Sequence, residues 1–243
     1  MRVLGIESST YSLGIGIVNM VQSAGRDNQT PIVEFETLIN SGMPQSERII
    51  DIIKEYGIMP SEIDGIGVSL GPGSFTGLRV GLAYAKGLTY ALNKPIVGVP
   101  TLDAFAYGYQ LIGKGVFTDN RIPNTDNRMK IMPVMDAKMG DVYTATYDIN
   151  GTRLTEYSAV ILNEWLNSLS GDNIFIGDGA RIHRHLIQEK LKNGKAHFIY
   201  PNPDSQRASC VALIAMERII TGKIDDIRSL EPIYLHNPRI KKK

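Results

Sequence analysis

Residues 69–81 read SLGPGSFTGLRVG and lie between an apolar run and a helical pattern. The glycine-flanked run from Ile66 to Leu70 predicts a buried strand. From Thr76 to Asn93 the spacing of apolar residues predicts a helix, and Pro95 to Val99 predicts the next strand. Strand, helix and strand in close succession are typical of the right-handed crossover of an α/β sheet.

The glycines of this segment do not match the standard nucleotide-binding motifs. A dinucleotide fingerprint requires G-x-G-x-x-G, and the third glycine here, Gly77, comes one residue late. A P-loop requires Gly-Lys-Ser/Thr, whereas Gly77 is followed by Leu78 and Arg79. The position before a helix suits a phosphate, but the spacing indicates a different use.

A stripe of small residues at four-residue spacing runs along the predicted helix. Residues four apart lie above one another on a helix, so the stripe forms a smooth groove where another element can approach closely. Two occupants are open: the chain's own sheet or neighbouring helix, or a helix of a partner protein. Arg79 lies beside the stripe and could anchor an acidic group. The stripe consists of Gly73, Gly77, Gly81 and Ala85.

The remaining pattern predicts an α/β fold in two similar lobes, residues 1–102 and 103–243. Each lobe begins with antiparallel strands and then alternates helix and strand. Asn150-Gly151 between alternating apolar runs is a strong hairpin signal. We allow for the helix at 209–221 to pack on the first lobe. Strands are expected at 3–6, 13–17, 32–39, 129–136, 141–148, 153–158 and 173–177, and helices at 49–56, 102–112, 164–169, 180–191 and 209–221, with 113–128 a loop or inserted hairpin.

Composition excludes several classes of protein. The 243 residues are 43% hydrophobic and 21% charged, which is typical of a globular chain and not of a disordered one. Cys210 is the single cysteine, so the chain has no internal disulfide and no cysteine-based zinc site. No apolar run is long enough to span a bilayer, and the first residues do not resemble a signal peptide, so we expect a cytoplasmic protein.

The charge is balanced overall, with 26 Lys+Arg against 25 Asp+Glu. Residues 239–243 contribute four of the positive charges, so the rest of the chain is mildly acidic. A protein that grips a phosphate backbone usually shows a broad basic face. We interpret the basic end as a solvated tail, and direct contact between it and RNA stays open.

Three polar turns form a candidate nucleotide cleft. A carboxylate followed by hydroxyl groups between two strands can hold hydrated Mg²⁺ or donate hydrogen bonds to a phosphate, although such side chains also satisfy turn backbone. The order of a carboxylate turn, a second carboxylate turn and a glycine turn is that of actin-like and sugar-kinase-like proteins. The residues are Glu7, Ser8, Ser9, Thr10, Asp136, Gly177, Asp178 and Gly179.

Four strings together resemble the bacterial TsaB family, formerly called YeaZ: IESSTYSLGIGIV, VSLGPGSFTGLRVGLAYAKGLTYALNKPIVGVPTLDAFA, MDAKMGDVYTATY and EPIYLHNP. The resemblance covers essentially the whole chain. It implies an actin-like, sugar-kinase-like (ASKHA) fold and a role in making threonylcarbamoyl-adenosine, the modified base beside the anticodon in tRNAs that read codons beginning with adenine.

The resemblance also implies partners. A TsaB-like chain pairs with the catalytic subunit TsaD through helices of its first lobe, and the ATPase TsaE joins that pair. We therefore expect the interface to include Ile49, Ile53, Gly73, Gly77, Arg79, Gly81 and Ala85. We expect a homodimer through the same face when the partner is absent. No cofactor is expected for the chain itself, and ATP or ADP with Mg²⁺ would act within the assembled complex, where tRNA is also bound.

The sequence favours a non-catalytic role. Catalytic relatives carry His-x-x-x-His after the strand that follows the glycine-rich helix, and the matching positions here are Thr101 and Phe105. The histidines lie elsewhere, and we expect surface positions for them: His183, His185, His197 and His236. Two residues depart from the family pattern: Glu7 where aspartate is more common, and Gln45 where histidine is more common.

Two alternative functions stay open. An ATP-dependent kinase or hydrolase could use Glu7, Asp136 and the glycine turn, but the sequence shows no general base and this fold hosts many functions. A metal-dependent peptidase is disfavoured because the histidine pair is missing.

Overall fold

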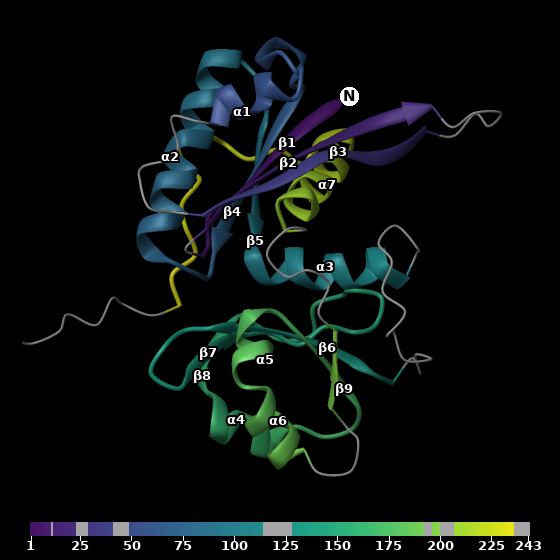
Figure 1. The fold of residues 1–243 in the computed structure, drawn as a ribbon, viewed down its shortest axis with the longest axis vertical. Coiled ribbons are helices and arrows are strands. Elements are labelled where there is room, and N and C mark those ends of the chain that lie inside the picture. The colour runs from purple at the N-terminus through teal and green to yellow at the C-terminus, as the bar shows by residue number, and fades with distance from the viewer. Residues whose placement is uncertain are drawn as a thin grey trace, which may run out of the picture. The chain divides into compact units, whose positions relative to one another are not determined.

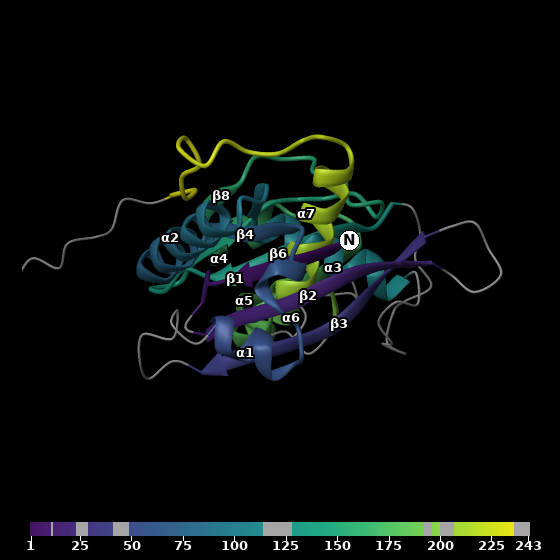
Figure 2. The same ribbon diagram turned by 90° about the horizontal axis from the view of Figure 1, so that it is seen from above.

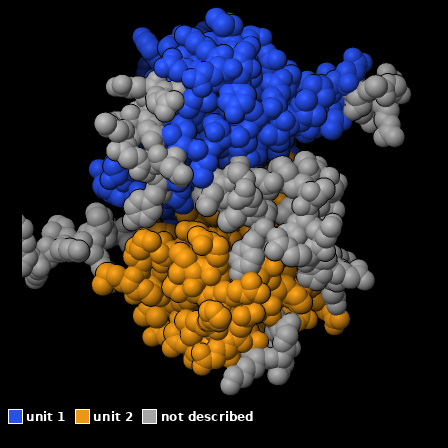
Figure 3. All heavy atoms as spheres, in the orientation of Figure 1, with its two compact units in different colours: residues 1–101, 204–233 blue, residues 102–203, 234–243 orange. Residues whose placement is uncertain are grey.

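The computed structural model describes residues 1–10, 12–22, 29–40, 49–113, 128–191, 196–199 and 207–235. The chain divides into two compact units, shown in Figures 1 and 3. Unit 1 comprises residues 1–101 and 204–233, and unit 2 comprises residues 102–203 and 234–243. The sequence analysis assigned 103–243 to the second lobe but allowed the helix at 209–221 to pack on the first; in the structure 204–233 belong to the first unit.

Unit 1 is built on a five-stranded mixed sheet with the order β3-β2-β1-β4-β5. The three strands β1, β4 and β5 are parallel to one another, and β2 and β3 form an antiparallel hairpin on one side. The strands are β1 (Arg2–Glu7), β2 (Ser12–Gln22), β3 (Gln29–Asn40), β4 (Gly65–Gly71) and β5 (Ile96–Pro100). The helices are α1 (Ile49–Glu55), the 3₁₀ turn η2 (Pro60–Glu62), α2 (Phe75–Leu92) and α7 (Arg207–Ile220).

Helices cover both faces of this sheet. Buried isoleucines and leucines of the strands pack with α1 and α2 in one core, which includes Leu4, Ile6, Ile53 and Leu82. The other face carries α7 (Figure 2). Ser74 caps the start of α2 by accepting a hydrogen bond from the Gly77 N–H, and Asn93 ends the helix in a left-handed conformation.

The α7 helix lies close to the sheet because glycines line its path across three strands. A Cβ at Gly5 of β1 would lie 2.0 Å from the Ala208 carbonyl oxygen, and one at Gly16 of β2 would lie 2.7 Å from the Ser209 nitrogen. A Cβ at Gly67 of β4 would lie 2.7 Å from the Ala215 Cβ and 2.9 Å from the Val211 carbonyl oxygen. These distances leave no room for a side chain, so glycine is required at each crossing.

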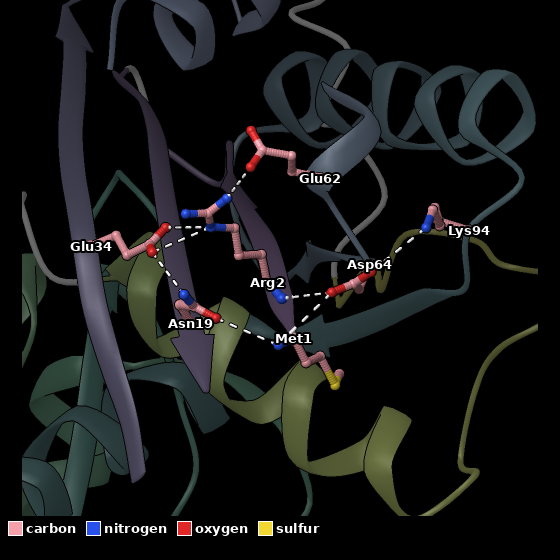
Figure 4. Close-up of polar contacts among 7 residues, drawn as sticks. All are labelled: Met1, Arg2, Asn19, Glu34, Glu62, Asp64 and Lys94. Carbon is pink, nitrogen blue, oxygen red and sulfur yellow. Dashed lines mark hydrogen bonds and ion pairs between the residues drawn. The ribbon is translucent and has the colours of Figure 1, made fainter. Parts of the chain in front are cut away.

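Ion pairs gather at the start of β1, where Arg2 joins neighbouring elements (Figure 4). Its Nε donates to both carboxylate oxygens of Glu34 at 3.0 and 3.2 Å, and its Nη1 lies 2.6 Å from Glu62. Asp64 accepts a hydrogen bond from the Arg2 backbone N–H and also pairs with Lys94 at 3.6 Å. The guanidinium uses Nε for Glu34 and Nη1 for Glu62, so it ties β1 to β3 and to η2 at once.

Unit 2 contains a second five-stranded sheet with the order β10-β9-β6-β7-β8. Matching β1–β5 to β6–β10 in turn gives the same order and the same parallel and antiparallel pairs. The strands are β6 (Lys130–Asp136), β7 (Asp141–Thr144), β8 (Ser158–Ile161), β9 (Asn173–Ile176) and β10 (Ala196–Phe198). The helices are α3 (Thr101–Gly113), α4 (Leu162–Ser168), α5 (Asp178–Ile182) and α6 (Arg184–Lys190). Two mixed sheets flanked by helices confirm the predicted fold class.

Two sequence predictions for unit 2 were wrong in detail, and one strand was missed. The predicted strand at 153–158 forms only an isolated bridge between Arg153 and Tyr147, and β7 pairs instead with β8. The predicted helix at 180–191 breaks at His183 into α5 and α6. The strand β10 was missed because its three residues are too short to show a period.

Some predictions fall outside the described residues. They include Gln45, most of the segment 113–128, His236 and the basic tail at 239–243. Within the described part of the chain, no helix has the length and apolar character needed to cross a membrane.

Candidate functional site

The small-residue stripe of α2 packs against the polar turn that follows β1. A Cβ at Gly73 would lie 2.3 Å from the Ser9 carbonyl oxygen, and one at Gly77 would lie 2.2 Å from the Ser8 carbonyl oxygen. At Gly81 the nearest atom would be the Ser8 hydroxyl oxygen, 2.0 Å away. The glycines therefore let the helix backbone contact the turn directly, and the helix N–H of Ser74 donates to Ser9 O at 2.6 Å.

Oxygen atoms fill the groove that these glycines form. Neither Ser8 Oγ nor Ser9 Oγ has a hydrogen-bond partner within the described residues, and both are buried. Close Cα–H···O contacts with the glycines are the weak interactions that such an arrangement allows. The stripe therefore packs inside the chain, but against the turn after β1 and not against the sheet or a neighbouring helix, as the internal alternative expected.

The other residues expected at a partner interface divide into buried and exposed groups. Ile49, Ile53 and Ala85 are fully buried in the core of unit 1. Arg79 is exposed, and its guanidinium stacks 3.8 Å above the Phe75 ring. A protein that contacted α2 would therefore meet its exposed side and not the stripe.

The exposed side of α2 carries a second row of residues that the sequence reasoning missed. Its members follow each other at spacings of four and three, which keeps them on one side of the helix. Val80 is 47% exposed and Tyr90 is 86% exposed, and nothing lies within 4 Å of a Cβ built on Gly87. We call this row the outer face of α2: Thr76, Val80, Ala83, Gly87 and Tyr90.

The first carboxylate turn satisfies its own backbone. Glu7 is only 1% exposed, and its Oε1 accepts a hydrogen bond from the Ser9 N–H at 2.7 Å. The Ser8 N–H donates to Ser69 Oγ of β4 at 3.0 Å. Thr10 follows with its hydroxyl 3.4 Å from the Ser12 carbonyl oxygen. The turn is held by β4 and α2 on either side.

The second carboxylate turn repeats this geometry in unit 2. Asp136 Oδ1 accepts from the Lys138 N–H at 3.1 Å, again two residues on, and Oδ2 lies 2.6 Å from Lys138 Nζ. His183 Nε2 lies 3.6 Å from Oδ1. Burial raises the pKa of Asp136, but the hydrogen bonds and the positive charge of Lys138, with a smaller effect of the nearby His183, lower it by more, so the net pKa is below the usual value.

The glycine turn of unit 2 packs on β6. A Cβ at Gly177 would lie 2.5 Å from the Val134 carbonyl oxygen, and Gly177 has φ of 110°. A Cβ at Gly179 would lie 2.9 Å from the Asp136 nitrogen. Glycine is thus needed here for close packing and for backbone conformation. Asp178 begins α5 between them.

The predicted cleft residues are therefore brought together in two separate groups. Glu7 to Thr10 lie in unit 1, and Asp136 lies with the glycine turn in unit 2. Each carboxylate holds the N–H two residues after it, which is a structural role. Both carboxylates also stand at the end of the first strand of their unit, as the repeated strand order requires.

The positions that match the histidine pair of catalytic relatives are interior. Thr101 is 0% exposed and Phe105 is 4% exposed. Asp103 between them accepts hydrogen bonds from Tyr147 Oη at 2.5 Å and Tyr157 Oη at 2.8 Å, which tie α3 to the rest of unit 2. We call these contacts of Asp103 with Tyr147 and Tyr157 the clamp. Sequence reasoning missed it because its three residues are far apart in the chain.

The described residues contain no group of three or more His, Cys, Asp or Glu side chains that could hold a metal ion. Of the histidines expected at the surface, His185 is exposed, whereas His183 and His197 are half-buried.

Comparison with known proteins places the chain in a family. A family model described as "TsaD: tRNA N6-adenosine threonylcarbamoyltransferase" matches residues 46–239. The "tRNA threonylcarbamoyladenosine biosynthesis protein TsaB" of Bacillus subtilis (strain 168) is 28% identical over 97% of this chain and 94% of its own length. The protein of the same name from Escherichia coli (strain K12) is 28% identical over 98% and 95%. The chain belongs to the TsaB (YeaZ) family.

Enzymes with the transferase name match a smaller part. The "tRNA N6-adenosine threonylcarbamoyltransferase" of Hyperthermus butylicus is 35% identical over 40% of this chain and 29% of its own length. TsaB proteins thus match from end to end, whereas that transferase shares less than a third of its length.

Solved structures show the same fold. The chain superposes on "YeaZ from Pseudomonas aeruginosa" with a TM-score of 0.66 at 18% identity, covering 96% of this chain and 99% of the other. For the ROK hexokinase of Thermus thermophilus the TM-score is 0.50 at 11% identity, covering 90% and 100%. The TsaB-family chain therefore has the predicted actin-like, sugar-kinase-like fold.

Proposed function

We propose that this chain is a non-catalytic subunit of the complex that makes threonylcarbamoyl-adenosine in tRNA. The complex transfers a threonylcarbamoyl group to the adenosine beside the anticodon in tRNAs that read codons beginning with adenine. The chain pairs with a TsaD-like catalytic subunit, and a TsaE-like ATPase joins the pair. ATP or ADP with Mg²⁺ acts within that assembly, where tRNA is held as well.

The observation that carries this proposal is the end-to-end match with proteins named for threonylcarbamoyladenosine biosynthesis. Thr101 and Phe105 support a non-catalytic role. Neither side chain is among the usual metal ligands, and both are buried. The two carboxylate turns support it too, because Glu7 and Asp136 already hold backbone N–H groups.

The outer face of α2 is the surface we assign to the partner. It offers apolar area from Val80 and Tyr90 and, at Gly87, a place where another backbone can come close. Exposed apolar area of this kind also drives self-association, so we expect a homodimer when the chain is purified alone.

Depletion of the protein tests the function. Bulk tRNA from depleted cells should lack most of its threonylcarbamoyl-adenosine when nucleosides are measured by mass spectrometry. A plasmid copy of the chain should restore the modification. Normal levels after depletion would refute the assignment.

Reconstitution tests the division of labour. The chain alone should produce no modified tRNA from ATP, a threonylcarbamoyl donor and tRNA. Added together with TsaE, it should raise the activity of the TsaD-like subunit. Val80→Glu should abolish binding to the TsaD-like subunit. Ile220→Glu, on the exposed part of α7, is the matched control and should leave binding intact.

A further inference from the structure

Positive charge gathers in one segment of unit 2, although the chain as a whole is balanced. Residues 181–197 contain five Lys+Arg and one Asp+Glu, whereas the rest of the chain, its basic tail included, holds more Asp+Glu than Lys+Arg. Three of the five cations lie on α5 and α6: Arg181, Arg184 and Lys190. These two short helices are therefore the most basic part of the described chain outside its ends.

The helices α5 and α6 bury one side and expose a polar flank (Figure 1). Ala180 and Ile187 lie in the core that also contains α4. The His183 N–H donates to Gly179 O at 3.0 Å and the Ile187 N–H donates to His183 O at 3.0 Å, so helical hydrogen bonds continue on both sides of the break. Four exposed residues follow each other at steps of three and four, which places them on one side. We call them the basic flank: Arg181, Arg184, His185 and Gln188.

Three members of the basic flank keep their polar groups available. Within the described residues, no side-chain hydrogen bond or ion pair involves Arg181, His185 or Gln188. Arg184 differs, because its guanidinium lies 5.1 Å above the Phe198 ring of β10 and the chain itself holds it. Arg184 therefore adds positive charge to the flank, whereas the other three can contact a ligand.

The neighbours of the basic flank do not neutralise it. Asp178, three residues before Arg181, is half-buried and has contacts of its own. Glu189 and the exposed Ile182 lie beside the flank and not in it. The flank itself therefore has no carboxylate and no apolar side chain.

This composition suits the backbone of a nucleic acid better than the surface of a protein. A protein interface has an apolar centre, which the basic flank lacks. Phosphate and sugar oxygens, by contrast, take half or more of the hydrogen bonds in nucleic-acid complexes, largely from arginine and from neutral polar side chains such as glutamine. Neighbouring members lie about 5–6 Å apart at their Cβ atoms, so they can contact successive groups of one strand.

We propose that the basic flank is a contact site for the phosphate backbone of RNA. Arg181 binds a phosphate, and His185 and Gln188 donate hydrogen bonds to neighbouring phosphate or ribose oxygens. The contact is independent of base sequence because it involves only the backbone. Only the identity of the RNA as tRNA rests on the proposed function.

Arg181→Gln in the full chain tests the contact. Fluorescence anisotropy with a labelled tRNA transcript should show a Kd that rises about threefold to tenfold at about 0.1 M NaCl. The plot of log affinity against log NaCl concentration should become shallower by about one, as expected for one lost phosphate contact. Transcripts of unrelated sequence should show the same loss. Gln188→Glu, which places a carboxylate in the flank, should also weaken binding, and thermal unfolding of both variants should be unchanged.

Matched controls separate the flank from the net charge. Lys190→Gln makes the same charge change on the other side of α6, and Lys223→Gln makes it in unit 1. Each should change the Kd less than about twofold, since salt screens distant charges. The effect of Arg181→Gln should persist when Lys241, Lys242 and Lys243 are all replaced by glutamine, because the tail is then no longer a source of contacts.

Three results would overturn the proposal. They are no binding of the transcript by the wild-type chain at about 0.05 M NaCl, equal losses from Arg181→Gln and the two lysine controls, and binding of poly-glutamate as tight as that of the transcript. The last result would assign the flank to an acidic protein. If the flank variants weaken RNA binding but depletion leaves the tRNA modification normal, the RNA contact stands and the proposed function fails.

The reverse combination, normal RNA binding by the variants and loss of the modification on depletion, refutes the contact alone.

Discussion

The carbonyl oxygen of Ser8 occupies the place where a side chain on Gly77 would begin, 2.2 Å from an ideal Cβ. Gly77→Ala must therefore move either the turn after β1 or the helix. We expect a loss of about 2 kcal/mol or more in the free energy of unfolding, as for other overpacked sites. Urea denaturation followed by circular dichroism measures the loss.

Gly87 of the same helix is the matched control, because a Cβ there has nothing within 4 Å. Gly87→Ala should stabilise the chain by about 0.5–1 kcal/mol through the greater helix propensity of alanine. Equal effects of the two substitutions would contradict the packing described for the stripe.

Asp103 holds two tyrosines that lie more than forty residues further along the chain. Asp103→Asn replaces the charged acceptor by a neutral amide and should destabilise the chain by about 1–3 kcal/mol. Thermal unfolding of the variant, compared with Asp172→Asn at an exposed position of unit 2, measures the difference. No difference between the two variants would show that the clamp contributes nothing.

Stability should fall at alkaline pH because of Tyr147. Burial raises its pKa far above the usual value, and the Asp103 carboxylate raises it further. The unfolded chain ionises this group near pH ~10 and the folded chain does not, so its contribution is present below that pH and is lost as pH rises above it. We expect Tyr147 to contribute about 1.4 kcal/mol per pH unit to the decline, so Tyr147→Phe should reduce the slope by that amount while other buried tyrosines, Tyr157 among them, still contribute. Identical pH profiles of both proteins would refute this.

Arg2 contributes to stability through its two contacts with Glu34. Arg2→Met should cost about 1 kcal/mol, since it removes a half-buried ion pair with Glu34 and a second one with Glu62. Lys94→Met should cost less than about 0.5 kcal/mol, because its 3.6 Å pair with Asp64 is a single, more exposed contact. The cost at Arg2 should shrink in high salt. A larger effect at Lys94 would reverse this ranking.

The sequence predicts the helices and strands of unit 1 well because their apolar periods are long and regular. In α2, apolar residues recur at helical spacing from Phe75 to Leu92. The same pattern could not reveal which side of α2 faces the sheet, since both sides carry small residues at helical spacing. Only the contact of Gly77 and Gly81 with Ser8 decides it.

Predictions failed where tertiary contacts override a local signal. The Asn150-Gly151 turn forms, with φ of 81° at Gly151, but Tyr147 pairs with Ile131 and Tyr157 reaches Asp103, so the second arm does not continue as a strand. The clamp and the ion pairs of Arg2 depend on residues far apart in the chain, which a pattern of neighbours does not encode.

The position of α7 in the chain has a consequence for synthesis on the ribosome. The strands of unit 1 are complete by Pro100, but the helix that covers Gly5, Gly16 and Gly67 is made only after residues 102–203, which form nearly all of unit 2. Unit 2 is almost continuous in sequence and can fold first, while the face of the unit 1 sheet that α7 covers is still exposed. A nascent chain stalled before residue 207 would therefore expose that glycine-lined face to chaperones and proteases.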